Sequence, residues 1–366
     1  MTLGVLKDAD NRVALTPDVV QKLTDLHHVF IERGAGANAF FADDQYTEAG
    51  ATVVPAEEVL QKANLLIRIK PPAESVFQSL SSNSVVISSF QPFNQPEIVE
   101  KLSEYPLTVF SMDMLPRTTL AQDKDVLSSM ASMAGYRAVL EAATHLPRYF
   151  PMLTTAAGSI PPAKVLILGA GVAGLQAIAT AKRLGAVVEV FDTRLAVKEE
   201  VQSLGAKFVE VEGAKDDKAA GGYAVEQSEE YKQRQQALII EKSEKADVII
   251  TTALLRGKPA PTLITEETVQ AMKPGSIIVD LAASGGGNCA LTQDNQTIVH
   301  QGITIIGDSS LEAKMPMHAS QLYAKNIFNF LKILTTDGEL SLDFEDPIIN
   351  NACLVHQGKA HYQVPQ

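Results

Sequence analysis

The feature that most constrains this chain is a glycine-rich turn between an apolar run and a helical pattern. The apolar residues Val165–Leu168 precede Gly169-Ala170-Gly171-Val172-Ala173-Gly174, and a helical pattern covers Val172–Leu184. In this context a G-x-G-x-x-G allows a tight turn, a close approach of the backbone to a pyrophosphate, and tight helix–strand packing. The start of the helix supplies free N–H groups and a partial positive charge for phosphates. We therefore predict a dinucleotide-binding α/β unit around these glycines.

An acidic residue stands where the ribose of a dinucleotide would be bound. The predicted strand Val187–Phe191 leads into Asp192, about 20 residues past the glycines, which is the usual place for this acid. A carboxylate there accepts hydrogen bonds from the ribose hydroxyls and repels a 2′-phosphate, which favours NAD over NADP. Arg194 leaves NADP open, because a nearby arginine can accommodate that phosphate. A Rossmann unit that binds no dinucleotide is the structural alternative.

Short apolar runs alternate with amphipathic segments in both halves of the chain. This alternation is typical of parallel sheets covered by helices. The predicted strands are Leu3–Leu6, Val29–Glu32, Leu65–Ile69, Ser84–Ser88 and Leu107–Phe110 in the first half, and Val165–Leu168, Val187–Phe191, Phe208–Val211, Val248–Thr251, Ile277–Leu281 and Ile303–Ile306 in the second. We expect an α/β protein with two Rossmann-like, doubly wound parallel-sheet domains joined by long helices.

Two long helical patterns mark the domain boundaries. The polar stretch 116–125 cannot be a core strand, and it leads into the first pattern, Val126–Leu146. The second pattern, His318–Leu334, should return the chain to the first domain, with Leu340–Phe344 and Leu354–His356 as short edge strands. We therefore expect an N-terminal domain of residues 1–127 plus 318–366, and an NAD(H)-binding Rossmann domain of residues 128–317.

Composition excludes several classes of protein. With 366 residues, 46% apolar and 20% charged, the chain is globular, and its net charge of −12 argues against nucleic-acid binding. Cys289 and Cys353 provide neither a disulfide framework nor a metal-type spacing, so we expect no metal site. Charged residues interrupt residues 7–12, and the uncharged, largely apolar stretch 165–181 is typical of a strand, a turn and a helix. We expect neither a signal peptide nor a membrane span, and a cytoplasmic location.

The chain is poor in acid–base chemistry. A dehydrogenase that oxidises an alcohol or an amine needs a proton acceptor beside the reacting carbon. None of the seven histidines lies beside the glycine turn. Asp280, at the end of a predicted strand, is the best carboxylate candidate, and a capping or loop-bonding role is an equally good interpretation.

Several strings of residues resemble the NAD(H)-binding alpha subunit of proton-translocating NAD(P) transhydrogenase, within the alanine dehydrogenase superfamily. The resemblance covers essentially the whole chain and is more specific than the glycine motif. The strings are Gly169–Leu184 with Phe191–Arg194, Thr251–Leu254 with Gly257–Pro261, Asp280–Ala282 with Gly286–Cys289, Ala134–Val139, Ala156–Gly158 and Leu322–Asn326.

The resemblance implies a reaction that needs no proton acceptor. In this family hydride passes directly between two nicotinamide rings, which must be held about 3–3.5 Å apart. The chain would bind NAD(H), and a partner subunit would bind NADP(H). The family also implies a homodimer, a membrane-spanning proton-channel subunit that couples hydride transfer to proton translocation, and a place on the cytoplasmic face of the inner membrane through these partners.

The resemblance also assigns site residues. The polar loop before the long helix would hold the nicotinamide through Arg117, Gln122, Asp125 and Ser128. A mobile loop within Glu210–Arg234 would close over the adenosine with Gly222 and Tyr223. The remaining cofactor contacts would be Gly169, Gly171, Val172, Ala173, Gly174, Asp192, Thr193, Arg194, Gln235, Ala253 and Leu254. The structural alternatives are a helix cap at Asp123 or Asp125, with Arg117 on a solvated surface, and a solvated loop and helix at 210–234.

The chain departs from the family pattern at several positions. Leu120 and Asp123 stand where the family usually has an arginine and a serine, Gly285 is an additional glycine, and Glu312–His318 differs from the expected pattern. These departures concern nicotinamide contact and partner docking.

Alanine dehydrogenase is the alternative enzyme, because it resembles this chain in fold and in the regions of Arg12 and Lys70, where that enzyme binds a carboxylate. It would need a histidine within 88–93 and an aspartate at Ser284, and this chain has neither. A non-enzymatic dinucleotide-sensing module is the third interpretation.

Overall fold

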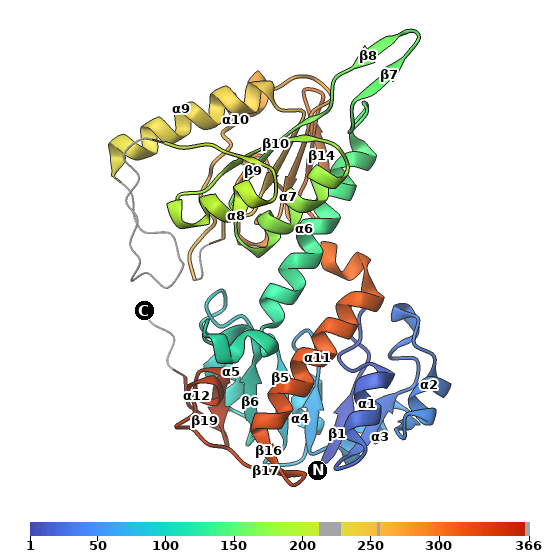
Figure 1. The fold of residues 1–366 in the computed structure, drawn as a ribbon. Helices are drawn as coiled ribbons and strands as arrows, with labels where there is room; N and C mark the ends of the chain where they lie inside the picture. Colours follow the sequence, from blue (N-terminus) through green and yellow to red (C-terminus); the bar gives the residue numbers. More distant parts are fainter. Residues whose placement is uncertain (212–227, 255–256, 363–366) are drawn as a thin grey trace. The chain divides into compact units, whose positions relative to one another are not determined.

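The computed structural model describes residues 1–211, 228–254 and 257–362. The chain divides into two compact units, and we describe each by itself (Figure 1). Unit 1 comprises Met1–Met130 and Ala313–Gln366, and unit 2 comprises Ala131–Glu312. The long helix α6, Val126–His145, crosses the boundary between them, and α11, Pro316–Leu334, begins just after the second boundary.

Unit 1 contains an eight-stranded sheet in the order β19-β18-β6-β5-β4-β1-β2-β3. Its first six strands in sequence are parallel, and the chain reverses its direction of progress between β1 and β4, as in doubly wound folds. Of the C-terminal strands, β18 pairs antiparallel with β6, and β19 pairs antiparallel with β18 at the edge of the sheet. The strands are β1 Thr2–Val5, β2 His28–Glu32, β3 Thr52–Val54, β4 Leu65–Ile67, β5 Val85–Ser88, β6 Thr108–Ser111, β18 Cys353–His356 and β19 Lys359–Ala360.

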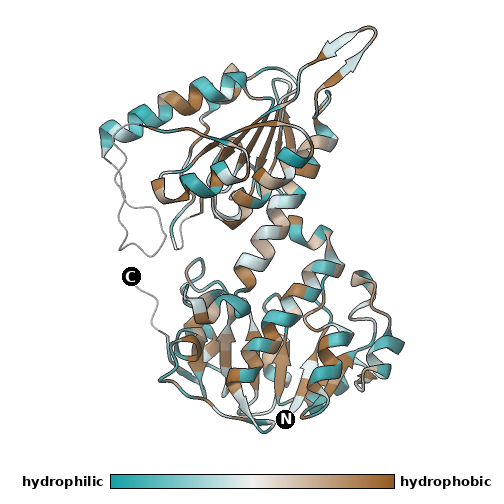
Figure 2. Cartoon of the chain, in the orientation of Figure 1, coloured by the Kyte–Doolittle hydropathy of each residue, from teal (hydrophilic) through white to brown (hydrophobic). Residues whose placement is uncertain are grey.

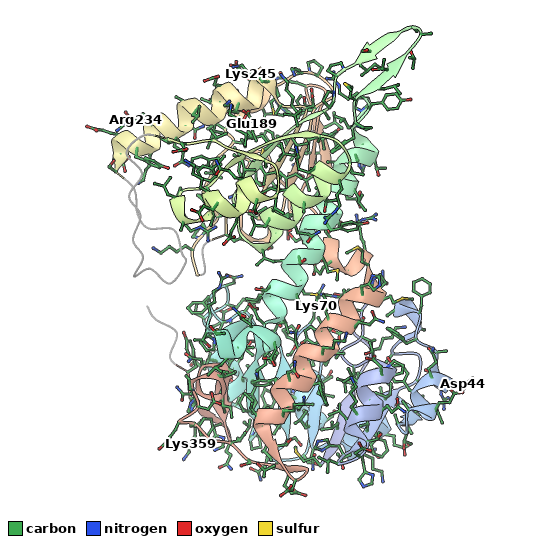
Figure 3. The ribbon with its side chains drawn as sticks, in the orientation of Figure 1. Asp44, Lys70, Glu189, Arg234, Lys245 and Lys359 are labelled. Atoms are coloured by element: carbon green, nitrogen blue, oxygen red, sulfur yellow. The ribbon has the colours of Figure 1, made fainter. Side chains whose placement is uncertain are left out.

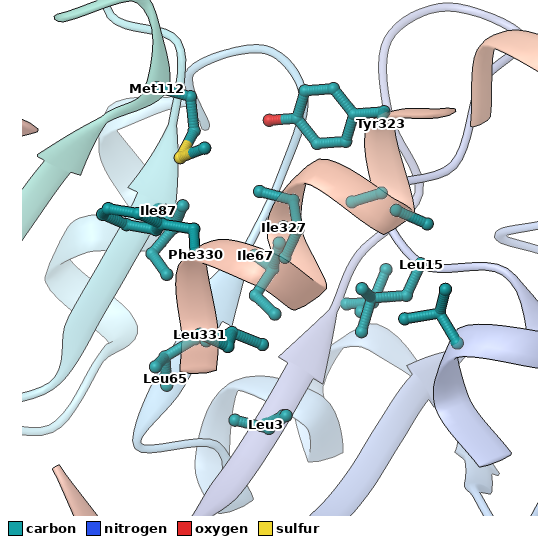
Figure 4. Packing of buried hydrophobic residues seen from close by; sticks show 14 of the residues in the cluster. Leu3, Leu15, Leu65, Ile67, Ile87, Met112, Tyr323, Ile327, Phe330 and Leu331 are labelled. Atoms are coloured by element: carbon teal, nitrogen blue, oxygen red, sulfur yellow. The ribbon is translucent and has the colours of Figure 1, made fainter. Parts of the chain in front are cut away.

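Apolar side chains fill both faces of this sheet. Leu65 and Ile67 of β4 belong to one buried cluster and Leu66 to the other, as the period of two along a strand requires. In Figure 4, Tyr323, Ile327, Phe330 and Leu331 of α11 lie over the first of these faces. The shorter helices of unit 1 are α1 Pro17–Leu23, α2 Asp43–Glu48, α3 Ala56–Lys62, α4 Glu74–Ser79, α5 Ile98–Ser103 and α12 Pro347–Ala352.

Unit 2 repeats the plan with a seven-stranded sheet in the order β11-β10-β9-β12-β13-β15-β14, in which only β14 is antiparallel. Its central strands are the most hydrophobic segments of the unit (Figure 2), as expected for strands covered by helices on both faces. The strands are β9 Lys164–Leu168, β10 Val187–Phe191, β11 Lys207–Phe208, β12 Val248–Thr251, β13 Ile277–Asp280, β14 Thr297–His300 and β15 Ile303–Ile306.

Charged side chains lie on both sides of helix α9, Glu229–Lys245. On α9, Arg234 and Lys245 project away from the sheet (Figure 3), whereas the Lys242 ammonium lies 3.0 Å from the Glu189 carboxylate of β10. Burial raises the pKa of Glu189, but hydrogen bonds from Lys242 and Lys207 outweigh it and hold this pKa below its ordinary value. The helices are α7 Val172–Arg183, α8 Lys198–Ser203, α9 Glu229–Lys245 and α10 Glu266–Ala271, and a hairpin of β7 Leu153–Thr155 and β8 Gly158–Ile160 precedes β9.

The two doubly wound sheets confirm the expected fold class, but three expectations for individual strands are wrong. Residues 341–344 form no strand. The strand predicted there ends at Leu340, because Glu339–Leu340 (β17) forms a short hairpin with Thr335–Thr336 (β16) and the chain leaves the hairpin after it. Asp337 and Gly338 both have positive φ there, which is the geometry of a tight hairpin turn. The strand predicted at Leu354–His356 is not at an edge, since β18 lies between β6 and β19. The strand predicted at Phe208–Val211 ends at Phe208.

None of the helices in the described ranges combines the length and the apolar character needed to cross a bilayer.

Candidate functional site

The turn between β9 and α7 has the geometry that its glycines predict. Gly169 adopts φ +106°, and its N–H donates to the carbonyl of Phe191 at 2.8 Å. A Cβ on Gly174 would lie 1.9 Å from the carbonyl oxygen of Gly169, so only glycine fits there. A Cβ on Gly171 would meet nothing within 4 Å, which leaves this side of the turn open. No described side chain caps α7, and its first residue, Val172, is 44% exposed. The turn can therefore offer backbone N–H groups to an anion.

Asp192 is attached directly to this turn. Its Oδ2 accepts a hydrogen bond from the backbone N–H of Ala170 at 2.7 Å, and the residue is only 8% exposed. The acid expected to bind ribose and the turn expected to bind pyrophosphate are thus parts of one constellation. It lies at the carboxyl ends of β9 and β10.

Arg194 forms an ion pair with the carboxylate of Asp192. Its Nε donates to Oδ1 at 2.9 Å, its Nη2 to Oδ2 at 2.7 Å and its backbone N–H to Oδ1 at 2.8 Å. The hydrogen bonds to Asp192 raise the pKa of the guanidinium above its ordinary value. The arginine that could have accommodated the 2′-phosphate of NADP is therefore paired with the neighbouring acid.

The segment after β12 forms the other side of the turn. Thr252 donates its hydroxyl to the carbonyls of Leu168 and Gly169 at 3.3 and 3.2 Å. Asn288, which is fully buried, holds Ala253 by both backbone groups: Oδ1 accepts from its N–H and Nδ2 donates to its carbonyl, each at 2.9 Å. Leu254, the next residue, is exposed. In doubly wound sheets ligands bind at this place, outside the strand ends where the order reverses.

The structure favours a loop-bonding role for Asp280. Its carboxylate is completely buried. It accepts hydrogen bonds from two side chains and three backbone N–H groups, namely those of Thr251, Ala282, Asn288, Cys289 and Thr292. One donor ends the neighbouring strand β12 and the other four belong to the loop that follows β13, so the carboxylate holds this loop in place. Sequence reasoning missed Asn288 as a supporting residue, because its partners are distant in the sequence.

The polar loop of unit 1 is a 3₁₀ segment, Thr119–Lys124, that ends at the first turn of α6. Asp125 accepts hydrogen bonds from the backbone N–H of Ser128 at 3.0 Å and from its hydroxyl at 2.5 Å. Asp125 therefore caps the helix, as one interpretation of the sequence expected. Of the four residues predicted to hold nicotinamide, the structure brings these two together. Gln122 and Arg117 are exposed.

Two asparagines that the sequence did not single out anchor this loop. Asn326 and Asn329 of α11 donate to the carbonyl of Asp123 at 2.9 and 3.1 Å. Asn326 also accepts a hydrogen bond from the hydroxyl of Ser129 at 2.8 Å. The loop backbone is thus fixed from α11 while Gln122 stays exposed.

The other residues predicted for the site lie on several different elements. Thr193 and Gln235 are half-buried, Gln235 on α9, which begins at Glu229 within the stretch predicted as a loop. Gly222 and Tyr223 lie outside the described residues. The loop 117–128 and the glycine turn belong to different units. Among the residues that the structure describes, no group of three histidine, cysteine or acidic side chains could hold a metal ion.

The region that would bind a carboxylate in alanine dehydrogenase is filled by an acid of this chain. Asp10 Oδ2 lies 2.6 Å from Arg12 Nη2 and 3.4 Å from Lys70 Nζ. Burial raises the pKa of Asp10, but hydrogen bonds and charge from Arg12, with the charge of Lys70, outweigh it and hold the pKa below its ordinary value. Both cations therefore already have a carboxylate partner.

Comparisons with known proteins agree with this site. The profile "Alanine dehydrogenase/PNT, N-terminal domain" matches residues 6–134, and "Alanine dehydrogenase/PNT, C-terminal domain" matches residues 138–363. A protein of Rhodospirillum rubrum named as the first part of NAD(P) transhydrogenase subunit alpha is 42% identical over 96% of this chain and 94% of its own length. NAD(P) transhydrogenase subunit alpha of Cereibacter sphaeroides is 45% identical over 96% of this chain and 68% of its own length.

Solved structures show the same relation. A transhydrogenase from Sinorhizobium meliloti superposes with a TM-score of 0.90 at 39% identity, covering 98% of this chain and all of the other. An L-alanine dehydrogenase superposes with a TM-score of 0.81 at 25% identity, covering 98% of this chain and 96% of the other. The chain therefore belongs to the alanine dehydrogenase/PNT family, and within it is more similar to the NAD(P) transhydrogenase alpha subunits than to this alanine dehydrogenase.

Proposed function

We propose that this chain binds NAD(H) at the turn between β9 and α7 and is the NAD(H)-binding component of a proton-translocating NAD(P) transhydrogenase. The observation that carries the proposal is the bond between Asp192 and the N–H of Ala170, 2.7 Å long. It joins an acid suited to ribose and a turn suited to pyrophosphate into one site. When bound, the nicotinamide supplies or accepts the hydride, and the partner subunit's NADP(H) is the other reactant.

The chain's own residues bind and orient. The first turn of α7 holds phosphates through its N–H groups, and Asp192 accepts the ribose hydroxyls, which disfavours a 2′-phosphate. Arg117, Gln122, Asp125 and Ser128 orient the nicotinamide. Direct hydride transfer requires no proton acceptor, which suits a site whose buried acid, Asp280, already accepts hydrogen bonds from five donors of its own unit.

The remaining assignments concern the assembly. Residues 128–317 form the NAD(H)-binding domain, with Gly222 and Tyr223 closing over the adenosine and Thr193, Gln235, Ala253 and Leu254 lining the site. Two copies of the chain form a homodimer. A membrane-spanning proton-channel subunit and an NADP(H)-binding subunit complete the complex and hold this chain at the cytoplasmic face of the inner membrane. The identity to transhydrogenase alpha subunits supports these assignments.

Binding and reconstitution test the proposal. The isolated chain should bind NADH about tenfold or more tightly than NADPH, which corresponds to about 1.4 kcal/mol. The change in NADH fluorescence on binding can be followed by titration. Adding the NADP(H)-binding partner should give hydride transfer from NADH to an NADP analogue. Equal affinities for the two dinucleotides would contradict the assignment of this chain as the NAD(H) component.

Alanine dehydrogenase activity is the second candidate, because Arg12 and Lys70 are present. Their pairing with Asp10 and the absence of histidine from Ser88–Phe93 count against it. Oxidation of NADH by pyruvate and ammonia, without any partner subunit, would support this candidate instead. A chain that binds NADH but catalyses neither reaction would fit a sensing module.

A further inference from the structure

Helix α6 lies unusually close to the first turn of α7. A Cβ placed on Gly135 of α6 would be 2.1 Å from the carbonyl oxygen of Ala173, 2.8 Å from its carbonyl carbon and 2.9 Å from its Cα. All three are backbone atoms, so no side chain could rotate away to make room. Ala173 is the second residue of α7, directly after the open glycine turn. Any side chain at position 135 must therefore displace the turn or the helix.

The same turn is confined from its other side. A Cβ on Gly169 would lie 2.3 Å from the Thr252 hydroxyl oxygen, and this hydroxyl donates to the Gly169 carbonyl. Gly174 in turn packs against the Gly169 carbonyl, 1.9 Å from where its own Cβ would be. Residues 169–174 are thus held between α6 and the segment that follows β12. Gly135 and Thr252 supply the two outer contacts, and neither contains a group expected to touch the dinucleotide.

Helix stability alone would not select glycine at this position. Glycine is among the poorest helix formers, and alanine is the best. Position 135 lies inside the 20-residue helix α6, far from both ends. The close approach to Ala173 accounts for a residue that propensity disfavours.

We propose that Gly135 and Thr252 are positioning residues for the bound dinucleotide: they fix the backbone of 169–174 from two sides and so set where its N–H groups meet the pyrophosphate. This inference rests on the proposed function and adds to it a determinant outside the glycine motif. An anion site made of backbone N–H groups depends on their direction, and a displacement of about 1 Å can cost orders of magnitude in function.

Ligands that do or do not contain the pyrophosphate separate this role from a general disturbance. In the full-length chain, Gly135→Ala should weaken the binding of NADH and of ADP-ribose by about tenfold or more. It should weaken the binding of adenosine much less, because adenosine lacks the pyrophosphate that the turn holds. Ser132→Ala, on the same helix, is the matched control: it raises helix propensity without adding an atom and should alter none of the three affinities.

A second variant tests the other contact and does not depend on the folding of Gly135→Ala. Thr252→Val keeps the shape of the side chain but removes the donor to Gly169. It should therefore weaken the binding of NADH and of ADP-ribose much more than that of adenosine, and Thr252→Ser should restore the affinity for NADH and ADP-ribose. Wild-type affinity for NADH in Gly135→Ala or Thr252→Val, or an equal loss for adenosine, would overturn the inference. A wild-type chain that binds no NADH would instead overturn the proposed function.

Discussion

The first five strands of each sheet have the same order, but the two units differ in the connection after their first strand. In unit 1, residues 6–16 separate β1 from α1, and two acids in this connection are engaged internally. Asp8 accepts from the backbone N–H groups of Ile69 and Lys70, and Asp10 pairs with Arg12. In unit 2, residues 169–171 alone separate β9 from α7, and they contain no acid. The carboxyl edge of unit 1 is therefore satisfied by its own chain, whereas that of unit 2 leaves backbone donors for a ligand.

The comparison shows that topology provides a place for a ligand and that the first connection decides its use. A short glycine connection brings the helix N-terminus up to the strand ends, where its N–H groups face outward. A longer, charged connection fills the same place with ion pairs. If this explanation is correct, variants in the two units should affect stability and binding separately.

The largest effect is expected from the core of unit 1. Phe330 of α11 is fully buried and packs edge-on against Phe110, with 5.8 Å between the centroids of the two rings. Phe330→Ala should lower the free energy of unfolding of unit 1 by about 3–5 kcal/mol, because it leaves a cavity. Calorimetry should show that the unfolding temperature of unit 1 falls. NADH should still raise the unfolding temperature of unit 2. Ile178→Ala, in the buried face of α7, is the matched change in unit 2 and should lower the transition that NADH raises.

Asp192 should provide the next largest effect. Asp192→Asn removes the charge but keeps the size, and NADH binding should weaken by about 1–3 kcal/mol because charged hydrogen bonds are lost. The preference for NADH over NADPH should narrow, since the repulsion of a 2′-phosphate disappears. Equilibrium dialysis with both dinucleotides measures this. In unit 1, Asp10→Asn is the control, and a change of NADH affinity there would contradict the contrast between the two units.

Gln122 should affect alignment more than affinity. Gln122→Asn shortens an exposed side chain of the unit 1 loop by one methylene. In the reconstituted complex, single-turnover hydride transfer should fall by about tenfold or more while NADH binding stays near wild type. Unchanged hydride transfer would remove Gln122 from the site. It would then leave unit 1 with no demonstrated part in the chemistry.

The smallest effect concerns pH and unit 2. The pKa of Glu189 is lower in the folded chain than the ordinary value of 4.5, so its pairing with Lys242 and Lys207 contributes stability above that pH. This stability is lost as the pH falls through the folded pKa, because protonation removes the charge. The carboxylate is partly exposed, so the contribution is below about 1 kcal/mol. Denaturation curves of wild type and Glu189→Gln should converge as the pH falls below the pKa of Glu189 in the folded chain. Parallel curves at all pH values would contradict the pairing.

Much of the nucleotide site could be predicted because its signals are local. The apolar run, the glycines and the helix lie within twenty consecutive residues, 164–183, and the predicted strands at Val187–Phe191, Val248–Thr251 and Ile303–Ile306 have the observed bounds. Asp192 follows the second strand at a spacing that the fold itself imposes. Such features depend on neighbouring residues, so the sequence alone indicates them.

Only the tertiary structure decided the rest, because the contacts join residues far apart in the chain. The antiparallel strand β18 pairs with β6 across more than half of the sequence, and no periodicity near residue 354 reveals that partner. Likewise, Asp280 is a loop anchor because five donors converge on it from Thr251 to Thr292. Gly135 is required because α6 meets the carbonyl of Ala173. Period and propensity describe one segment at a time, whereas these roles depend on which surfaces the folded chain brings into contact.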